Sequence, residues 1–299
     1  MNHNPSKEQI INQAIQFHLK GNIPEATKYY QQLISEGCNH HIVFSNYGLI
    51  LQSLGKLQEA EKYVRKAIKI NPKFVDAYLN LGIILRDLGK LQEAEESTLK
   101  AIKLRPDNAN AHSNLGVILK DLGKLQEAEK YLRKAIDIDP EYFNAYLNLG
   151  IIFKDFGNLR EAEKFTCKAI EINPNLAVAY YNLGGILRGK GKLQEAESAA
   201  RKAIEIQPNL PNVYLSLGNI LRDLSKFQEA EKYARQSVEI NPNCAKSNYL
   251  LSLTLSDQEK YLEAFEEIQK AVQKDKNNHN FQGEFTRLKF ILNEISLEE

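Results

Sequence analysis

Apolar residues recur along the chain with the spacing of an α-helix. In the segment 75–88, Tyr78, Leu81, Gly82 and Leu85 are three or four positions apart, which places them on one face of a helix. Gly89 follows, and glycine there can take the left-handed conformation that ends a helix. A second helical pattern runs on until a proline, which cannot continue a helix, stops it. The pattern therefore predicts two helices joined by a short turn.

This pair of patterns repeats every 34 residues. The sequence GKLQEAEKY occurs at 55–63 and again at 123–131, and six prolines and six glycines recur with the same step. If the repeating proline is given position 32, eight repeats follow: 7–40, 41–74, 75–108, 109–142, 143–176, 177–210, 211–244 and 245–278. We therefore expect one elongated array, with a tail at 1–6 and a capping helix and tail at 279–299.

Small residues at fixed positions predict close packing between the two helices of a repeat. Glycine at position 8 costs a helix about 1 kcal/mol relative to alanine, so close approach must offset that cost. The terminal repeats differ, with Ala14 and Ser252 in place of this glycine. Ser6 and Gln9 predict a capping box at the start of the first helix. A last helix at 280–297, which would cover the end of the array, is predicted from Phe281, Phe285, Leu288, Leu292 and Ile295.

The 34-residue repeat resembles the tetratricopeptide repeat. That family has an aromatic residue at position 4, leucine and glycine at positions 7 and 8, alanines at positions 20 and 27, and proline at position 32. One clear match consists of Tyr146, Leu149, Gly150, Phe153, Ala162, Ala169 and Pro174. The resemblance implies an all-α fold. It would be an α-solenoid in which antiparallel helix pairs form a right-handed superhelix, with the first helices lining its concave groove.

Position 6 of each repeat faces that groove if the resemblance holds. It is asparagine in six successive repeats: Asn12, Asn46, Asn80, Asn114, Asn148 and Asn182. Because an amide both donates and accepts hydrogen bonds, such a row could hold an extended peptide by its backbone. The row resembles the asparagine ladder in the repeat region of O-linked N-acetylglucosamine transferases. Asparagine is also common here in the family, so a role in orienting neighbouring helices is the alternative.

Charged residues follow at positions 12 and 13. Position 12 supplies further candidate peptide-binding residues, namely Arg86, Lys120, Lys154, Arg188 and Arg222. Position 13 carries aspartate in most of the same repeats, and Gly189 interrupts that row. Opposite charges so close together screen each other, so the groove should favour neutral or mixed-charge partners. A solvated charged face is the alternative.

Apolar residues occupy two further positions predicted to face the groove. Position 9 supplies Leu49, Ile83, Val117 and Ile151, and position 5 supplies Leu79, Leu147 and Leu215. They would form either pockets for a bound peptide or the core between repeats. The family's chaperone-type carboxylate clamp is not matched at these positions.

Composition narrows the class of protein further. The 299 residues carry a formal net charge of +1, which argues against a nucleic-acid-binding protein. No apolar run approaches the roughly 18 residues that suggest a membrane span, and the first residues do not resemble a signal peptide. We therefore expect a cytoplasmic monomer with no membrane association. The three cysteines are expected to be reduced, part-buried thiols.

No constellation of residues predicts catalysis, a metal or a cofactor. The segment 184–190 has the form GxxxxGK, but no Ser or Thr follows it and no strand precedes it. Ion pairs such as Glu61–Arg65 are expected on the outer face and are assigned no function. The sequence thus predicts a non-enzymatic scaffold that binds an extended peptide or partner segment. The alternatives are a substrate-recruiting region of, or partner to, a glycosyltransferase or other transferase, and end-to-end self-association, which the polar end repeats disfavour.

Overall fold

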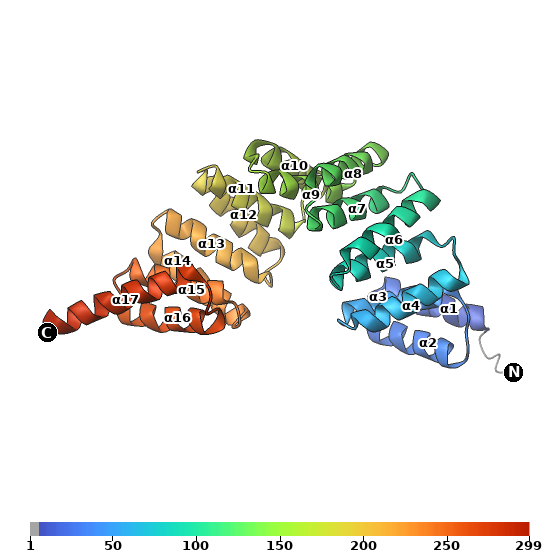
Figure 1. Ribbon diagram of the computed structural model, residues 1–299, viewed down its shortest axis with the longest axis horizontal. Helices are drawn as coiled ribbons and strands as arrows, with labels where there is room; N and C mark the ends of the chain where they lie inside the picture. Colours follow the sequence, from blue (N-terminus) through green and yellow to red (C-terminus); the bar gives the residue numbers. More distant parts are fainter. Residues whose placement is uncertain (1–5, 299) are drawn as a thin grey trace. The chain divides into compact units, whose positions relative to one another are not determined.

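The computed structural model describes residues 6–298, and in that part of the chain it contains seventeen α-helices and no strand (Figure 1). The first eight helices are α1 (Lys7–Leu19), α2 (Ile23–Ser35), α3 (His41–Ser53), α4 (Leu57–Ile70), α5 (Val75–Asp87), α6 (Leu91–Leu104), α7 (Ala109–Asp121) and α8 (Leu125–Ile138). The remainder are α9 (Phe143–Asp155), α10 (Leu159–Ile172), α11 (Ala177–Gly189), α12 (Leu193–Ile206), α13 (Pro211–Asp223), α14 (Phe227–Ile240), α15 (Ala245–Ser256), α16 (Tyr261–Lys274) and α17 (His279–Glu298). The all-α prediction is confirmed. Residues 1–5 of the predicted tail and residue 299 lie outside the described residues.

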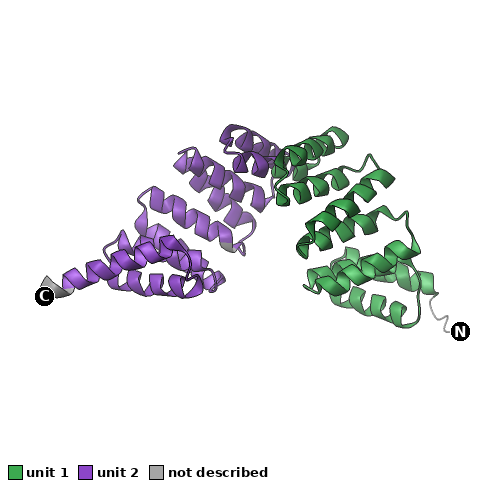
Figure 2. Cartoon of the chain, viewed as in Figure 1, with its two compact units in different colours: residues 1–148 green, residues 149–299 purple. Residues whose placement is uncertain are grey.

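The chain divides into two compact units, Met1–Asn148 (unit 1) and Leu149–Glu299 (unit 2), and the division falls within α9 (Figure 2). In unit 1, the helices pack in sequence order as the pairs α1–α2, α3–α4, α5–α6 and α7–α8. The second helix of one pair also packs against the first helix of the next pair at the junctions α2–α3, α4–α5 and α6–α7. Unit 2 follows the same order from α11 to α16, and α17 packs against α16. Consecutive helix pairs therefore supply one another's core, as expected of a repeat array.

The turn between the two helices of a pair depends on a left-handed backbone. Gly55, Gly89 and Gly123 have φ angles of 74–75°, which confirms the predicted glycine cap. The turns of repeats seven and eight have the same conformation without glycine. Ser225 has a φ of 58°, and Glu259 has a φ of 62°. The turn geometry is thus retained even where the residue does not favour it.

Glycine at position 8 allows the two helices of a pair to approach closely. A Cβ added at Gly116 would lie 2.6 Å from Cγ of Leu132 on α8. Similar overlaps occur at Gly48, Gly82 and Gly150, which face the second helix of their own pair. The packing reason predicted for this glycine is therefore confirmed.

The aromatic residue at position 4 and the proline before it are connected by a hydrogen bond. Tyr78 donates from its hydroxyl to the carbonyl oxygen of Pro72 at 3.2 Å, and Tyr214 donates to that of Pro208 at 2.8 Å. This contact ties the first helix of a pair to the loop that precedes it. It gives a physical reason for the two residues to recur together.

Each end of the array shows its own arrangement. The predicted capping box is present, because Ser6 Oγ accepts from the Gln9 amide at 3.2 Å and Gln9 Oε1 accepts from the Ser6 amide at 2.7 Å. The predicted last helix is present as α17, in which Phe281 and Leu288 are buried. Ile295 is 40% exposed and lines a cleft with Leu262 at the start of α16, so it covers the array less completely than Phe281 and Leu288 do. The end of α17 extends beyond the helices that its first turns cover.

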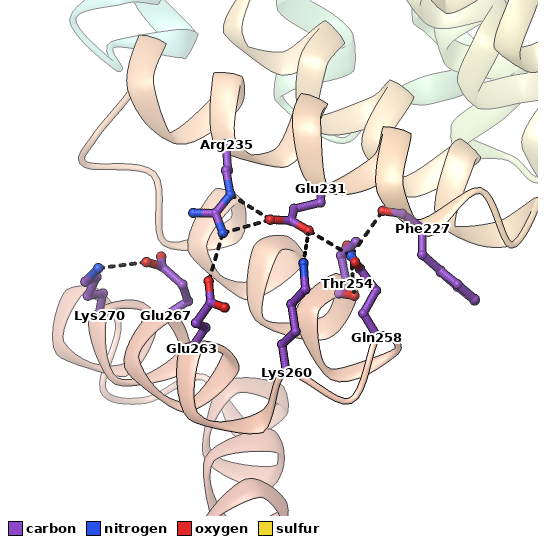
Figure 3. A network of polar contacts seen from close by, with 9 residues as sticks. All are labelled: Phe227, Glu231, Arg235, Thr254, Gln258, Lys260, Glu263, Glu267 and Lys270. Atoms are coloured by element: carbon purple, nitrogen blue, oxygen red, sulfur yellow. Dashed lines mark hydrogen bonds and ion pairs between the residues drawn. The ribbon is translucent and has the colours of Figure 1, made fainter.

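The ion pairs predicted between residues four apart on one helix are present, and several of their carboxylates also bind a lysine of the next helix pair. Figure 3 shows Glu231 on α14 accepting hydrogen bonds from Arg235 on the same helix and from Lys260 and Gln258 beyond α15, each at 2.9 Å. A pattern of residues four apart on one helix does not reveal the lysine 29 residues later, because this lysine comes into contact only when the helix pairs pack. The same arrangement recurs around Glu61. These carboxylates therefore serve the packing between repeats.

Burial and hydrogen bonding shift the pKa of Glu231 in opposite directions. Burial raises the pKa of this carboxyl group, because the charged form is desolvated. Hydrogen bonds from Lys260, Arg235 and Gln258 stabilise the charged form and outweigh burial, and together they lower the pKa to about 2. The Glu231 side chain, which is only 16% exposed, is therefore held in its charged form by groups on both sides of the junction.

Candidate functional site

The first helices of successive pairs lie next to one another and form a continuous surface. In unit 1, α3 contacts α5 and α5 contacts α7, and in unit 2, α11 contacts α13 and α13 contacts α15. We call the surface formed by these helices in each unit the first-helix face. It carries most of the asparagines and charged residues that the sequence singled out.

The two amides of the row that lie on α3 and α5 are hydrogen-bonded within unit 1. Asn46 donates from Nδ2 to the hydroxyl of Tyr30 at 3.1 Å, and Asn80 donates from Nδ2 to Oγ of Ser45 at 3.0 Å. Ser45 is buried on α3, one repeat before Asn80. In the described residues, Oδ1 of neither asparagine accepts a hydrogen bond. Each amide is thus oriented by the protein and retains its acceptor.

The rest of the row is not uniform. Asn114 and Asn148 are half-buried like Asn46, whereas Asn182 is 7% exposed and Asn12 is exposed. The Nδ2 atom of Asn114 is buried and has no partner among the described residues. Leu79 stands at the position that corresponds to Ser45, so no hydroxyl is available to accept. The asparagine at position 6 therefore has more than one environment.

The charged residues pair from one first helix to the next. Nε of Arg188 lies 2.5 Å from Oδ2 of Asp223, and Arg222 pairs in the same way with Asp257. In unit 1, Nε of Arg86 lies 3.6 Å from Oδ2 of Asp121. Each pair joins position 12 of one repeat to position 13 of the next. The position-12 arginines on this face are therefore neutralised by the protein itself.

The two lysines of this row differ from the arginines. Nζ of Lys120 lies 3.4 Å from Oδ1 of Asp121, its neighbour in the chain. Lys154 is exposed and forms no ion pair among residues 6–298. The residue one repeat ahead of it at position 13 is Gly189, which has no carboxylate to offer.

The apolar candidates separate into two groups. At position 5, Leu79 and Leu147 are buried and belong to the core, while Leu215 is half-buried. At position 9 all four candidates are half-buried, namely Leu49, Ile83, Val117 and Ile151. The position-9 side chains thus remain partly accessible beside the amides.

Unit 1 also contains a cleft that the sequence analysis missed. It has a volume of about 560 Å³ and lies between α1 and α3. Its lining includes Ile11, Asn12, Ile15, Cys38 and Ile42. The available signal was Cys38, which stands where later repeats have proline, after Gly37 with a φ of 74°. At this connection α2 packs less closely on α3 than the second helix of other pairs packs on the first helix of the next pair.

Several further expectations can be placed on the structure. Gly184 lies within α11, so the GxxxxGK segment forms a helix rather than a phosphate-binding loop. In the part of the chain that the structure describes, no three His, Cys, Asp or Glu residues are grouped to hold a metal ion. Cys38 is buried, but Cys167 is exposed, so the expectation of part-buried thiols was wrong for Cys167. None of the described helices combines the length and apolar character needed to cross a bilayer.

Solved structures similar to this chain share its fold. A chain of the APC/C hetero-tetramer Cut9–Hcn1 is 15% identical with a TM-score of 0.75, over 95% of this chain and 56% of that chain. This chain thus spans little more than half the length of that relative. A tetratricopeptide repeat protein from Parabacteroides merdae is 22% identical with a TM-score of 0.65, over 83% of this chain and 98% of that one. The pilF protein of Pseudomonas aeruginosa is 21% identical with a TM-score of 0.64, over 72% and 96%.

Sequence comparison gives the family. No curated protein matches the chain, and the likeness to O-linked N-acetylglucosamine transferases stays a prediction. Models of the tetratricopeptide repeat match residues 43–74, 73–141, 107–175, 177–210 and 211–244. These matches cover more than half of the 299 residues, and the chain belongs to the tetratricopeptide repeat family.

Proposed function

We propose that this protein is an interaction scaffold that binds an extended segment of a partner protein on the first-helix face. Members of the tetratricopeptide repeat family generally serve as scaffolds for protein interactions. The observation that carries the proposal is the state of Asn46 and Asn80. Their Nδ2 atoms are held by Tyr30 and Ser45, while their Oδ1 atoms accept no bond from the described residues.

This arrangement suits recognition of a peptide backbone. An amide whose orientation is fixed before binding loses little conformational entropy when a ligand arrives. Its free acceptor can receive a backbone N–H, a group present in every residue except proline. The half-buried Leu49 and Ile83 lie in the same helices and could contact the side chains of the segment. Because the arginines are already paired, the bulk of the affinity would come from amides and apolar contacts.

The test uses a peptide ligand chosen without knowledge of the natural partner. A phage-displayed library of random 12-residue peptides is selected against the full chain, and the selected peptides are synthesised. We expect replacement of Asn80, Asn114 and Asn148 together by alanine to weaken their binding about tenfold or more, because each hydrogen bond contributes about 0.5–1.5 kcal/mol. Isothermal titration calorimetry measures the dissociation constants.

The control is Ser45→Ala. This variant removes the intramolecular acceptor of Asn80 but leaves every amide of the row in place. It should lower stability much as the loss of one buried hydrogen bond does. It should weaken binding less than the triple variant does, because it releases the orientation of one amide and removes none. Equal affinity of the triple variant and the wild-type protein would remove the amide row from the mechanism.

A further inference from the structure

The pairing of charges between position 12 of one repeat and position 13 of the next is interrupted at one place in unit 2. Arg188 pairs with Asp223, and Arg222 pairs with Asp257, in each case 35 residues later. The residue 35 positions after Lys154 is Gly189. No described residue forms an ion pair with Lys154, including its neighbour Asp155. The described chain thus supplies no counter-charge to this lysine.

Contacts within unit 2 place Gly189, the residue that lacks a carboxylate, beside the end of α9. Gly189 is the last residue of α11, and a Cβ added there would lie 3.1 Å from Cδ1 of Leu159. Leu159 begins α10, and Lys190 pairs with Glu163 on the same helix. The end of α11 is therefore fixed against the turn that follows α9. Lys154 belongs to the last turn of α9, directly before that turn.

A second glycine on α11 has no packing reason. A Cβ added at Gly185 would meet no atom within 4 Å, whereas one added at Gly116 would overlap with Leu132. A glycine inside a helix costs about 1 kcal/mol relative to alanine. The same position carries a half-buried leucine, isoleucine or valine in every other repeat except the seventh, which has Asn219; Ile83 and Val117 are examples. At Gly185 the helix surface is therefore open to close approach by another backbone.

We propose that Lys154 and the surface beside Gly185 and Gly189 form a subsite for an acidic side chain of the bound segment. A glutamate or aspartate of the segment would give Lys154 the counter-charge that Asp223 gives Arg188. The backbone of the segment would pass over the open surface at Gly185. This inference rests on the proposed function and adds the chemical class of the ligand, an extended segment with a carboxylate at a fixed position.

The experiment again uses the full chain and the random 12-residue library. Selected peptides are synthesised with amidated C-termini, which removes the terminal carboxylate as an alternative ligand. Each is also made with its acidic residue changed to the corresponding amide. Fluorescence anisotropy gives dissociation constants for the wild-type protein, Lys154→Gln and Gly189→Asp. The matched control is Lys103→Gln, which makes the same change of charge at an exposed lysine in the last turn of α6.

Lys154→Gln should weaken binding of the acidic peptide about two- to fivefold, as expected for a largely exposed ion pair. Gly189→Asp should weaken it similarly, because the new aspartate competes for Lys154. Neither variant should change the dissociation constant of the amide peptide. This peptide already lacks the carboxylate that would contact Lys154, and the effects of changing both partners of one contact are not additive. Lys103→Gln should leave both affinities unchanged. Circular dichroism should show the same melting curve for Lys154→Gln as for the wild-type protein.

The results separate this inference from the proposed function. Peptides whose binding requires the asparagines, but which bind Lys154→Gln and the wild-type protein equally, would overturn the subsite and leave the scaffold proposal standing. Equal binding of the acidic and amide peptides to the wild-type protein would overturn the subsite too. A selection that yields no binding peptide would contradict both proposals.

Discussion

At the scale of single residues, the turn between paired helices shows what a backbone conformation demands. Six repeat turns use glycine at positive φ, while Ser225 and Glu259 take the same conformation with side chains. A left-handed residue with a Cβ costs about 1–2 kcal/mol relative to a right-handed one, whereas glycine takes either conformation readily. These two positions are therefore sites of local strain in unit 2.

We expect Ser225→Gly to raise the free energy of unfolding by about 0.5–1 kcal/mol. The relief of strain is partly offset by the greater flexibility that glycine gives to the unfolded chain. Urea denaturation followed by circular dichroism measures the change. Gly191→Ser is the matched reverse change, because Gly191 has a φ of 74° at the same position of the previous repeat, and it should lower stability. An unchanged or lower stability of Ser225→Gly would contradict the prediction.

The sequence predicts which residues share the first-helix face better than it predicts their bonds. The 34-residue period is enough to place Asn80 and Asn114 at the same position of successive helices. Their bonds depend on the residue one repeat earlier, which is Ser45 for Asn80 and Leu79 for Asn114. That residue comes into contact only after the helix pairs have packed. A pattern within one repeat therefore cannot reveal it.

At the scale of helices, the junction between α14 and α16 shows how polar groups support packing between pairs. Glu231 accepts from Arg235, Gln258 and Lys260, and Arg235 also donates to Glu263 at 3.1 Å (Figure 3). The residues come from two successive helix pairs. A carboxylate held in this way remains ionised at a pH where a free one would be protonated.

We expect Glu231→Gln to destabilise the protein near neutral pH by roughly 1–3 kcal/mol. Because the pKa of Glu231 is lowered from 4.5 to about 2 on folding, its contribution is complete above pH 4.5 and is lost as the pH falls towards 2. The difference between variant and wild-type protein in urea unfolding should therefore shrink between pH 5 and pH 2.

Glu239→Gln is the control for this prediction. Glu239 is exposed on the same helix, α14, and forms no ion pair with any described residue. Its replacement should change stability by less than about 0.5 kcal/mol. A difference between Glu231→Gln and the wild-type protein that stayed constant down to pH 2 would show that the network does not act through the charge of Glu231.

The helices themselves were predictable because every local signal agrees. Periodic apolar residues, a turn glycine and a terminal proline recur in the same order, and they predict helix pairs at each repeat. The looser junction between α2 and α3 was not foreseen, because a single replacement of proline by Cys38 does not specify how a loop will run. Local sequence patterns therefore predict where helices form better than they predict how closely consecutive helix pairs pack.

At the scale of the whole molecule, each helix pair buries its apolar side largely against its neighbours. A terminal pair has a neighbour on one side only, so its other side needs a cover. In unit 2, α17 provides this cover, because Phe281 and Leu288 pack with Leu251, Leu255 and Ile268. The exposed side chains of α17 include the polar Gln282, Thr286 and Lys289, together with Phe290, which is 61% exposed.

Removal of α17 should therefore both destabilise unit 2 and promote self-association. A chain that stops at residue 278 exposes the apolar groups covered by Phe281 and Leu288, and loss of one such side chain alone costs about 2–5 kcal/mol. Its thermal unfolding should begin at a lower temperature, and light scattering should show larger species. A chain that stops at residue 292 keeps both residues and should behave as the full chain does. The chain that stops at residue 278 could instead be as stable and as uniform in mass as the full chain. In that case the ends of helix pairs would need no cover, and stacking on a neighbour could not be the main source of stability in unit 2.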